Sequence, residues 1–141
     1  CSDYSDLADS IVENLGEKEW AKKVYEKAEK KAKGCSEFYV LAGSIHENLR
    51  DKEWAKKVYE KSEKKAKDSS EFESLAYRII SILGDKDWAK KLYKKAEDKV
   101  DDRVYGSESY AGLAESIRDN LGDKKWAELL EQKAKELEDD D

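Results

Sequence analysis

Residues 7–29 read LADSIVENLGEKEWAKKVYEKAE, and near-copies of this stretch recur three times along the chain. The copies are LAGSIHENLRDKEWAKKVYEKSE at 41–63, LAYRIISILGDKDWAKKLYKKAE at 75–97 and LAESIRDNLGDKKWAELLEQKAK at 113–135. The period is 34, 34 and then 38 residues, as marked by Trp20, Trp54, Trp88 and Trp126. Self-similarity at such a period is typical of proteins built from stacked helical hairpins.

Each copy contains two amphipathic patterns, which predict two helices. In both patterns the apolar residues lie three and four positions apart. They are Tyr4, Leu7, Ala8, Ile11 and Leu15 in the first pattern, and Trp20, Ala21, Val24, Tyr25, Ala28 and Ala32 in the second. A single hairpin cannot bury both stripes, so neighbouring hairpins must stack. We therefore interpret the tryptophans as core residues rather than as ligand-binding residues.

The turn between the two helices carries Gly16, Gly84 or Gly122 in three of the copies, and Arg50 in the remaining one. Glycine adopts the left-handed conformation that ends a helix, and a residue with a side chain there would cost about 1 kcal/mol. The acidic residue after the turn is expected to cap the second helix. The first helices are expected to begin after a capping serine. These serines are Ser2, Ser36, Ser70 and Ser107.

The longer third interval reflects a four-residue insertion around VDDRVYGS, residues 100–107. It predicts a longer helix or a distinct loop between the third and fourth hairpins. The fold class expected from the whole pattern is all-α, an α-solenoid of four tandem helix-turn-helix repeats with eight helices. We expect a single repeat domain over 1–141, with units at approximately 1–34, 35–68, 69–106 and 107–141.

The composition excludes several classes of protein. Charged residues make up 44% of the chain, which alone would favour disorder, but 10% are aromatic and argue for a packed core. A net charge of −6 argues against nucleic acid as a partner. The lysines alternate with acids at helical spacing, as Glu19 does with Lys23, and indicate solvated helix faces. No long apolar run predicts a transmembrane segment, which favours a soluble, cytoplasmic protein although the compartment stays open.

No pattern of catalytic, cofactor-binding or metal-binding residues is present, so we expect no enzyme activity and no cofactor. Phosphate-binding, dinucleotide-binding, zinc-binding and serine-nucleophile motifs are all missing. His46 is the single histidine and has no second ligand to act with. Cys1 and Cys35 occupy equivalent places one repeat apart and form no metal-ligand cluster, and we expect two free thiols near helix starts rather than a disulfide. The acidic end, residues 136–141, is expected to be a frayed tail.

The repeat resembles a known family. A 34-residue helix-turn-helix with LA in the first helix, GD at the turn, and Ala89, Tyr93 and Ala96 in the second is similar to the tetratricopeptide repeat, over nearly the whole chain. The chain departs from that pattern in having no proline and in one extra residue before the turn glycine. The resemblance implies a right-handed superhelix whose concave surface, lined by the first helices, holds peptides or partner proteins. Sel1-like repeats are the alternative.

The copies differ mainly in their first helices, whereas the second helices are nearly identical. The fifth, ninth and twelfth places of each unit vary, and their spacing of four and three puts them on one helix face. We call this the variable face and predict that it forms a partner-binding groove. The predicted groove residues are Tyr39, Gly43, His46, Glu73, Tyr77, Ile80, Glu115 and Arg118. The alternative is that these positions are unconstrained surface, or that Tyr39 and Ile80 pack against a neighbouring hairpin.

Two functions from different classes fit this pattern. The first is a scaffold that binds a protein or peptide on the variable face. The second is a structural spacer, or an idealised repeat array without a ligand, which the near-copied second helices and the lack of proline and methionine favour. The first hairpin has no polar cap before Tyr4, so Leu7 and Ile11 should be partly exposed. We therefore also expect either a longer array or self-association through the N-terminal hairpin.

Overall fold

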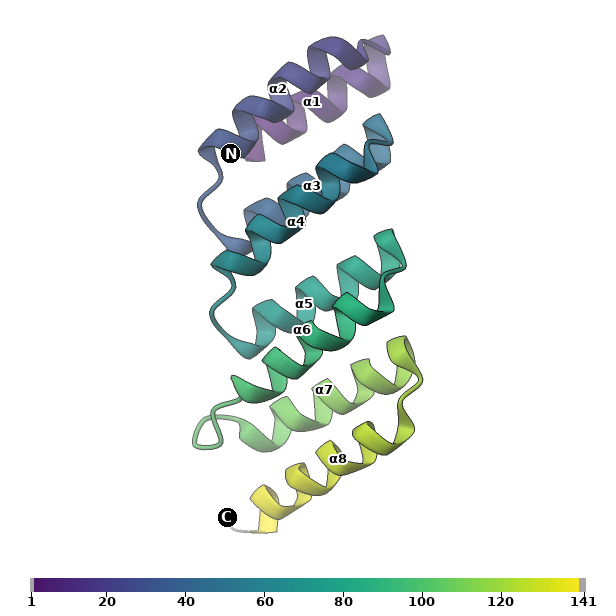
Figure 1. The fold of residues 1–141 in the computed structure, drawn as a ribbon. Coiled ribbons are helices and arrows are strands. Elements are labelled where there is room, and N and C mark those ends of the chain that lie inside the picture. The colour runs from purple at the N-terminus through teal and green to yellow at the C-terminus, as the bar shows by residue number, and fades with distance from the viewer. Residues whose placement is uncertain (1, 140–141) are drawn as a thin grey trace. The chain divides into compact units, whose positions relative to one another are not determined.

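The chain is all-α in the computed structural model, which describes residues 2–139 (Figure 1). No strand occurs between residues 2 and 139. The helices are α1 (Ser2–Leu15), α2 (Lys18–Lys31), α3 (Cys35–Leu49), α4 (Lys52–Lys65), α5 (Ser69–Arg78) with the π-helical turn η1 (Ile79–Leu83), α6 (Lys86–Asp98), α7 (Gly106–Leu121) and α8 (Lys124–Asp139). The predicted all-α class and the predicted eight helices are therefore confirmed over this part of the chain.

The helices form two compact units, Cys1–Ala66 and Lys67–Asp141. In the first unit, α1 pairs with α2 and α3 pairs with α4, and both α1 and α2 pack against α3. In the second unit, α5 pairs with α6 and α7 with α8, and both α5 and α6 pack against α7 (Figure 1). Each unit is thus two stacked hairpins, as the amphipathic stripes require. A single domain, a continuous solenoid and its handedness stay predictions.

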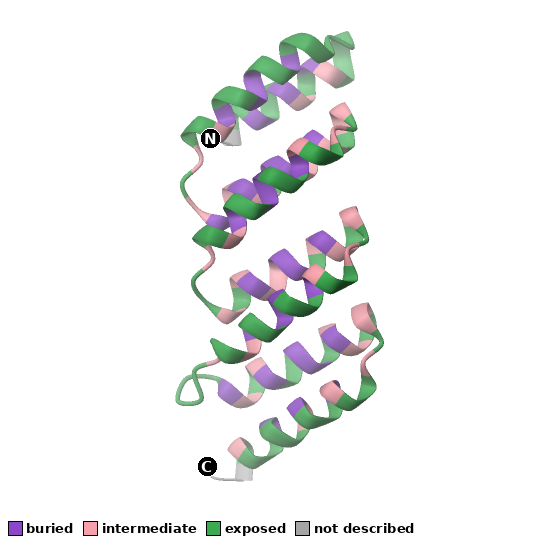
Figure 2. Cartoon of the chain, viewed as in Figure 1, coloured by how far each residue is buried: buried purple, intermediate pink, exposed green. Residues whose placement is uncertain are grey.

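The core of each unit is made of alanine, aliphatic and tyrosine side chains on the facing sides of the helices (Figure 2). Alanines such as Ala21 and Ala28 are fully buried and let neighbouring helices approach closely. Tyr25 and Tyr93 are also fully buried and fill the wider spaces between hairpins. Each of these residues belongs to the apolar stripe expected for the second helix.

The interpretation of the tryptophans as core residues is wrong in its simple form, because none of them is fully buried. Trp54 and Trp126 are half-buried, with one edge of the indole covered by the preceding hairpin of the same unit. Trp20 is 51% exposed. Leu7 is 48% exposed, as predicted, whereas Ile11 is buried and its predicted exposure is wrong.

The turns within the hairpins follow the expected backbone chemistry. Gly16, Gly84 and Gly122 have φ between 64° and 68°, and Arg50 adopts the same left-handed conformation with φ of 56°. The next acidic residue caps the second helix in three hairpins, for example where the Trp54 amide donates to Asp51 Oδ1 at 3.0 Å. Glu17 makes no such side-chain cap.

The predicted serine caps are wrong for α3, α5 and α7. These helices begin two residues earlier than expected, so Ser36, Ser70 and Ser107 lie within the first turn. The cap predicted at Ser2 falls on a side chain outside the described part. Asp68 caps α5 by accepting from the Glu71 amide at 2.9 Å, while Gly34 and Tyr105 precede α3 and α7 without a side-chain cap. A carboxylate is as good a cap as a hydroxyl, and the sequence pattern did not separate the two.

The insertion forms a distinct loop, residues 99–105, between α6 and α7 (Figure 1). The Val104 amide donates to the Asp101 carbonyl at 3.1 Å, and Tyr105 is left-handed with φ of 54°. Gly106 then starts α7 against α8, where a Cβ would lie 2.9 Å from Leu137 Cδ1. Of the two predicted alternatives, a longer helix or a distinct loop, the distinct loop is confirmed.

The acidic end is more ordered than expected, because α8 continues to Asp139 and Leu137 is half-buried. The predicted frayed tail is wrong up to that residue, and its last two residues lie outside the described part. Helical spacing of apolar residues up to Leu137 extends the amphipathic stripe and stabilises this last turn. No helix between residues 2 and 139 is long and apolar enough to cross a membrane.

Candidate partner-binding face

The eight predicted groove residues lie on the first helices of three hairpins. Tyr39, Gly43 and His46 lie on α3 in the first unit. The others lie in the second unit, namely Glu73 and Tyr77 on α5, Ile80 in η1, and Glu115 and Arg118 on α7. None of the eight is buried. The variable face therefore consists of one patch on α3 and a second patch shared by α5 and α7.

The α5 and α7 patch combines an exposed aromatic ring with charged side chains. The Ser116 hydroxyl of α7 donates to Glu73 Oε1 of α5 at 2.6 Å, which ties the two first helices side by side. Tyr77 lies one helical turn beyond Glu73 and is 54% exposed. Arg118 of α7 forms an ion pair with Glu131 of α8. Both partners of that pair are substantially exposed, so it adds little to stability and is easily exchanged for another contact.

The corresponding place on α1 has a structural role. Asp9 accepts from Asn48 Nδ2 at 2.8 Å, from Ser44 Oγ at 3.4 Å and from the Tyr25 hydroxyl. Burial of Tyr25 raises the pKa of its hydroxyl, and the hydrogen bond to the Asp9 carboxylate raises it further. This cluster joins α1, α2 and α3. At this hairpin, one variable position serves the packing of its own unit.

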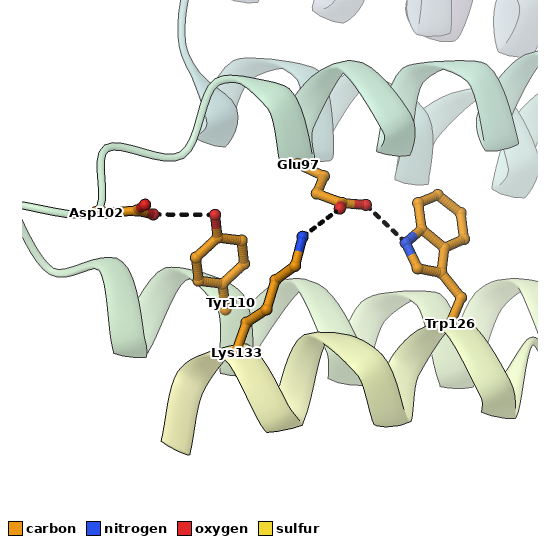
Figure 3. Close-up of polar contacts among 5 residues, drawn as sticks. All are labelled: Glu97, Asp102, Tyr110, Trp126 and Lys133. Carbon is orange, nitrogen blue, oxygen red and sulfur yellow. Dashed lines mark hydrogen bonds and ion pairs between the residues drawn. The ribbon is translucent and has the colours of Figure 1, made fainter. Parts of the chain in front are cut away.

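In each unit, a cluster of hydrogen bonds also joins the second helix of one hairpin to the second helix of the next hairpin. In the first unit, Glu29 of α2 accepts from Trp54 Nε1 of α4 at 2.8 Å and also from Lys61. In the second, Glu97 of α6 accepts from Trp126 Nε1 at 2.8 Å and from Lys133 Nζ at 2.9 Å, both on α8 (Figure 3). The cluster was not predicted from the sequence. The signal for it was a glutamate nine residues after a tryptophan in the first three copies.

The pKa shifts of Glu29 and Glu97 favour the ionised form of both carboxylates, which is the form that accepts hydrogen bonds. Burial by itself would raise the pKa of the Glu97 carboxyl, but hydrogen bonds from Lys133 and Trp126 favour its ionised form and lower that pKa. The pKa of Glu29 is lowered in the same way by Lys61 and Trp54. A carboxylate that stays ionised at neutral pH is a good hydrogen-bond acceptor, as each glutamate is for an indole and a lysine.

One further hydrogen bond anchors the insertion loop to α7. Asp102 accepts from the Tyr110 hydroxyl at 3.0 Å (Figure 3). Burial of the Tyr110 ring and this hydrogen bond together raise the pKa of its hydroxyl to about 12. The phenol is therefore a neutral donor at physiological pH, and the contact fixes the position of the loop beside the start of α7.

The two cysteines that occupy equivalent places in the repeat differ in what the structure describes of them. Cys35 is buried at the start of α3, with its thiol 3.2 Å from Ser62 Oγ, and the Ser62 hydroxyl donates to the Cys35 carbonyl at 2.8 Å. Cys1 lies outside the described residues. Within residues 2–139, no three histidine, cysteine or acidic side chains are placed to hold a metal ion. Cys35 thus contacts Ser62 of α4 through both its thiol and its carbonyl oxygen.

Comparison with known proteins adds no relative. No protein-family model matches the chain, and neither a curated protein sequence nor a solved structure matches it. The resemblance to tetratricopeptide repeats therefore rests on the residues of the chain itself. The comparisons identify neither a family nor a function for the chain.

Proposed function

We propose that the chain is a peptide-binding scaffold of the tetratricopeptide-like type, which holds a segment of a partner protein on its variable face. The observation that carries the proposal is Tyr77, a large aromatic side chain that is 54% exposed at a position that differs between the copies. An exposed tyrosine on a rigid helix is the kind of side chain that dominates protein interfaces. The second helices of the first three copies are nearly identical and supply the rigid support.

The chemistry of the patch describes the segment that fits it. Tyr77 and the half-buried Ile80 offer apolar surface, while Glu73 and Arg118 offer one charge of each sign. Ala111 of α7 is exposed on the same face and is small enough to let a backbone lie close to the helix. An extended segment with an apolar side chain between polar ones would cover this surface.

The test is selection of peptides from a displayed random library against the intact chain, followed by affinity measurement with Tyr77→Ser. Truncating an interface aromatic costs more than about 1.4 kcal/mol at a hot spot, so we expect at least roughly tenfold weaker binding. Tyr105→Ser is the matched control, because Tyr105 is also an exposed tyrosine of the second unit but lies in the insertion loop.

Peptides that bind Tyr77→Ser as tightly as the parent chain would refute the variable face as the binding site. If no peptide is retained at all, the structural spacer becomes the better hypothesis. That alternative draws on the Glu97 and Glu29 clusters, which repeat with the same donors in both units and hold hairpins together without any ligand.

We also propose that the hairpins form one right-handed solenoid. The proposal is supported by the 34-residue period and by the same hairpin stacking within each unit. Small-angle X-ray scattering distinguishes a single elongated rigid particle from two units with a variable separation. A crystal structure would then determine the hand.

A further inference from the structure

A groove with a basic lining runs between α6 and α8 on the second-helix side of the second unit. Its volume is about 570 Å³. It is lined by Lys90, Lys91, Lys94, Asp123, Lys125, Trp126 and Leu129. We call it the basic groove. It lies on α6 and α8, whereas the variable face of this unit lies on α5, η1 and α7.

Apolar surface is available in the middle of this groove. Lys94 Nζ lies 5.5 Å from the centre of the Trp126 ring, so the ring face carries a cation. Leu129 is 65% exposed, although it lies only one helical turn from Trp126. The Trp126 indole N–H is held by Glu97, which fixes the ring as a wall of the groove (Figure 3). A ligand in the groove can pair with the lysines and at the same time cover the apolar surface of Leu129 and Trp126.

The repeat provides an internal comparison for this groove. The junction of α2 and α4 in the first unit has the same framework, with Trp54 bonded to Glu29. Yet its residues at the places of Lys94, Lys125 and Leu129 are Glu26, Glu53 and Lys57. Its other lining positions keep two lysines and an aspartate, at Lys22, Lys23 and Asp51. The first junction thus carries three lysines and three carboxylates, while the basic groove carries four lysines and one carboxylate.

The residues in which the basic groove differs from the first junction make it more basic and more apolar, in contrast to the acidic and highly charged chain as a whole. The whole protein has a net charge of −6, but here two glutamates are replaced by lysines and a solubilising lysine by leucine. Gathering four lysines costs free energy through mutual repulsion, and Asp123 is the single carboxylate in the lining. Glu97, which holds the Trp126 ring, already accepts from Trp126 and Lys133. The hairpin framework does not require these residues, because the first unit folds in the same way without them. An anionic ligand would account for them.

We propose that the basic groove binds an acidic peptide segment in which an apolar side chain is flanked by carboxylates. The carboxylates would pair with Lys90, Lys94 and Lys125, and the apolar side chain would cover Leu129 beside the Trp126 ring. A nucleic acid fits less well, since the lysines form one short cluster on a strongly acidic chain and a backbone of phosphates needs an extended basic surface. An acidic peptide also matches the apolar part of the groove.

The test uses a fluorescein-labelled peptide of aspartate and glutamate with one central leucine, and the intact chain. We expect saturable binding that weakens as salt is raised, because exposed charges are screened. Two companion peptides separate the contributions. Replacing every carboxylate by its carboxamide should abolish binding, and replacing the leucine by serine should weaken it severalfold.

Because the basic groove and the first junction are equivalent in the repeat, their residues can be exchanged in either direction. Lys94→Glu, Lys125→Glu and Leu129→Lys together give the basic groove the residues of the first unit, and should weaken binding at least tenfold. Glu26→Lys, Glu53→Lys and Lys57→Leu together give the first unit the residues of the basic groove, and should raise the stoichiometry from one peptide per chain to two. Circular dichroism and thermal melts confirm that both triple variants are folded.

Three results would overturn the proposal. One is no binding of the acidic peptide at millimolar concentration and low salt. Another is equal binding by the parent chain and the charge-reversed triple variant. The last is tighter binding of a single-stranded oligothymidine than of the acidic peptide, which would assign the groove to nucleic acid. Loss of peptide binding by Tyr77→Ser concerns the variable face alone, so the two proposals fail separately.

Discussion

At the scale of single residues, the position that ends each first helix is decided by backbone conformation rather than by side-chain contacts. Arg50 occupies the place of a glycine and has φ of 56°, and its amide donates to the His46 carbonyl at 3.0 Å. Its side chain is exposed. The strain predicted from the repeat pattern is therefore present in the folded chain.

Arg50→Gly should stabilise the protein. Removing the side chain relieves the left-handed strain of about 1 kcal/mol, while the greater freedom of glycine in the unfolded chain offsets part of the gain. We expect the free energy of unfolding to rise by about 0.5 kcal/mol or more, measured by urea denaturation. Arg50→Ala is the control, since it removes the side chain but keeps the strain. Equal stability of Arg50→Gly and Arg50→Ala would contradict this account.

At the scale of helices, each unit is held by polar clusters laid over an alanine-rich core. Asn48 Nδ2 of α3 donates to the Tyr25 hydroxyl of α2 at 2.8 Å, and Asn120 Nδ2 of α7 donates to the Tyr93 hydroxyl of α6 at 3.0 Å. Together with the glutamate clusters, these bonds fix how far one hairpin is rotated on the next. Small core residues alone would allow sliding, so the polar contacts define the stacking.

Acid should destabilise the units through Glu29 and Glu97. The folded-state pKa of each is lowered from an ordinary value of 4.5, so the unfolded chain binds protons more readily. Their contribution to stability is complete above pH 4.5 and is lost as the pH falls through the folded-state pKa. We expect the melting temperature to decline below pH 4.5, measured by circular dichroism.

The double variant Glu29→Gln with Glu97→Gln is the control for that decline. It should unfold about 1 to 2 kcal/mol more easily at neutral pH, because charge-assisted hydrogen bonds are weakened, and its acid decline should be shallower. A double variant whose pH profile runs parallel to that of the parent chain would show that other carboxylates cause the loss.

At the scale of the whole molecule, the N-terminal hairpin leaves apolar surface uncovered. Leu7 and Trp20 are each about half exposed, whereas Leu41, which occupies the place of Leu7 in the next hairpin, is fully buried. Lys135 of α8 stands where Glu29 and Glu97 stand in earlier hairpins. A second copy therefore cannot offer Trp20 the same carboxylate through α8, which favours contact between two N-terminal faces.

We expect the chain to self-associate through this N-terminal face at high concentration. Leu7→Lys should return it to a monomer, because a buried lysine without a partner is costly at an apolar interface. Sedimentation velocity over a wide range of concentration measures the change. Leu129→Lys is the matched control, since it places a lysine at an exposed leucine of the other unit. A parent chain that stays monomeric throughout would refute the prediction.

The candidate sites were only partly accessible to sequence reasoning. The variable face could be proposed from the sequence because positions that differ among copies are visible without coordinates. None of its eight residues is buried, and its role in binding stays a prediction. The basic groove was missed because its residues come from α6 and α8, which are separated along the chain by all of α7. Each lysine by itself matched the expected solvated helix face.

The amino-acid sequence by itself determined the hairpins, their turns and the insertion loop. These features depend on periodicity and on local backbone preference, as the left-handed Arg50 shows. Only the tertiary structure decided that Tyr25 and Tyr93 fill the core while Trp54 and Trp126 lie at its edge, bonded to Glu29 and Glu97. The physical reason is that an apolar stripe is about 100° wide and leaves the rotation of each helix open. Contacts between distant residues then select one rotation.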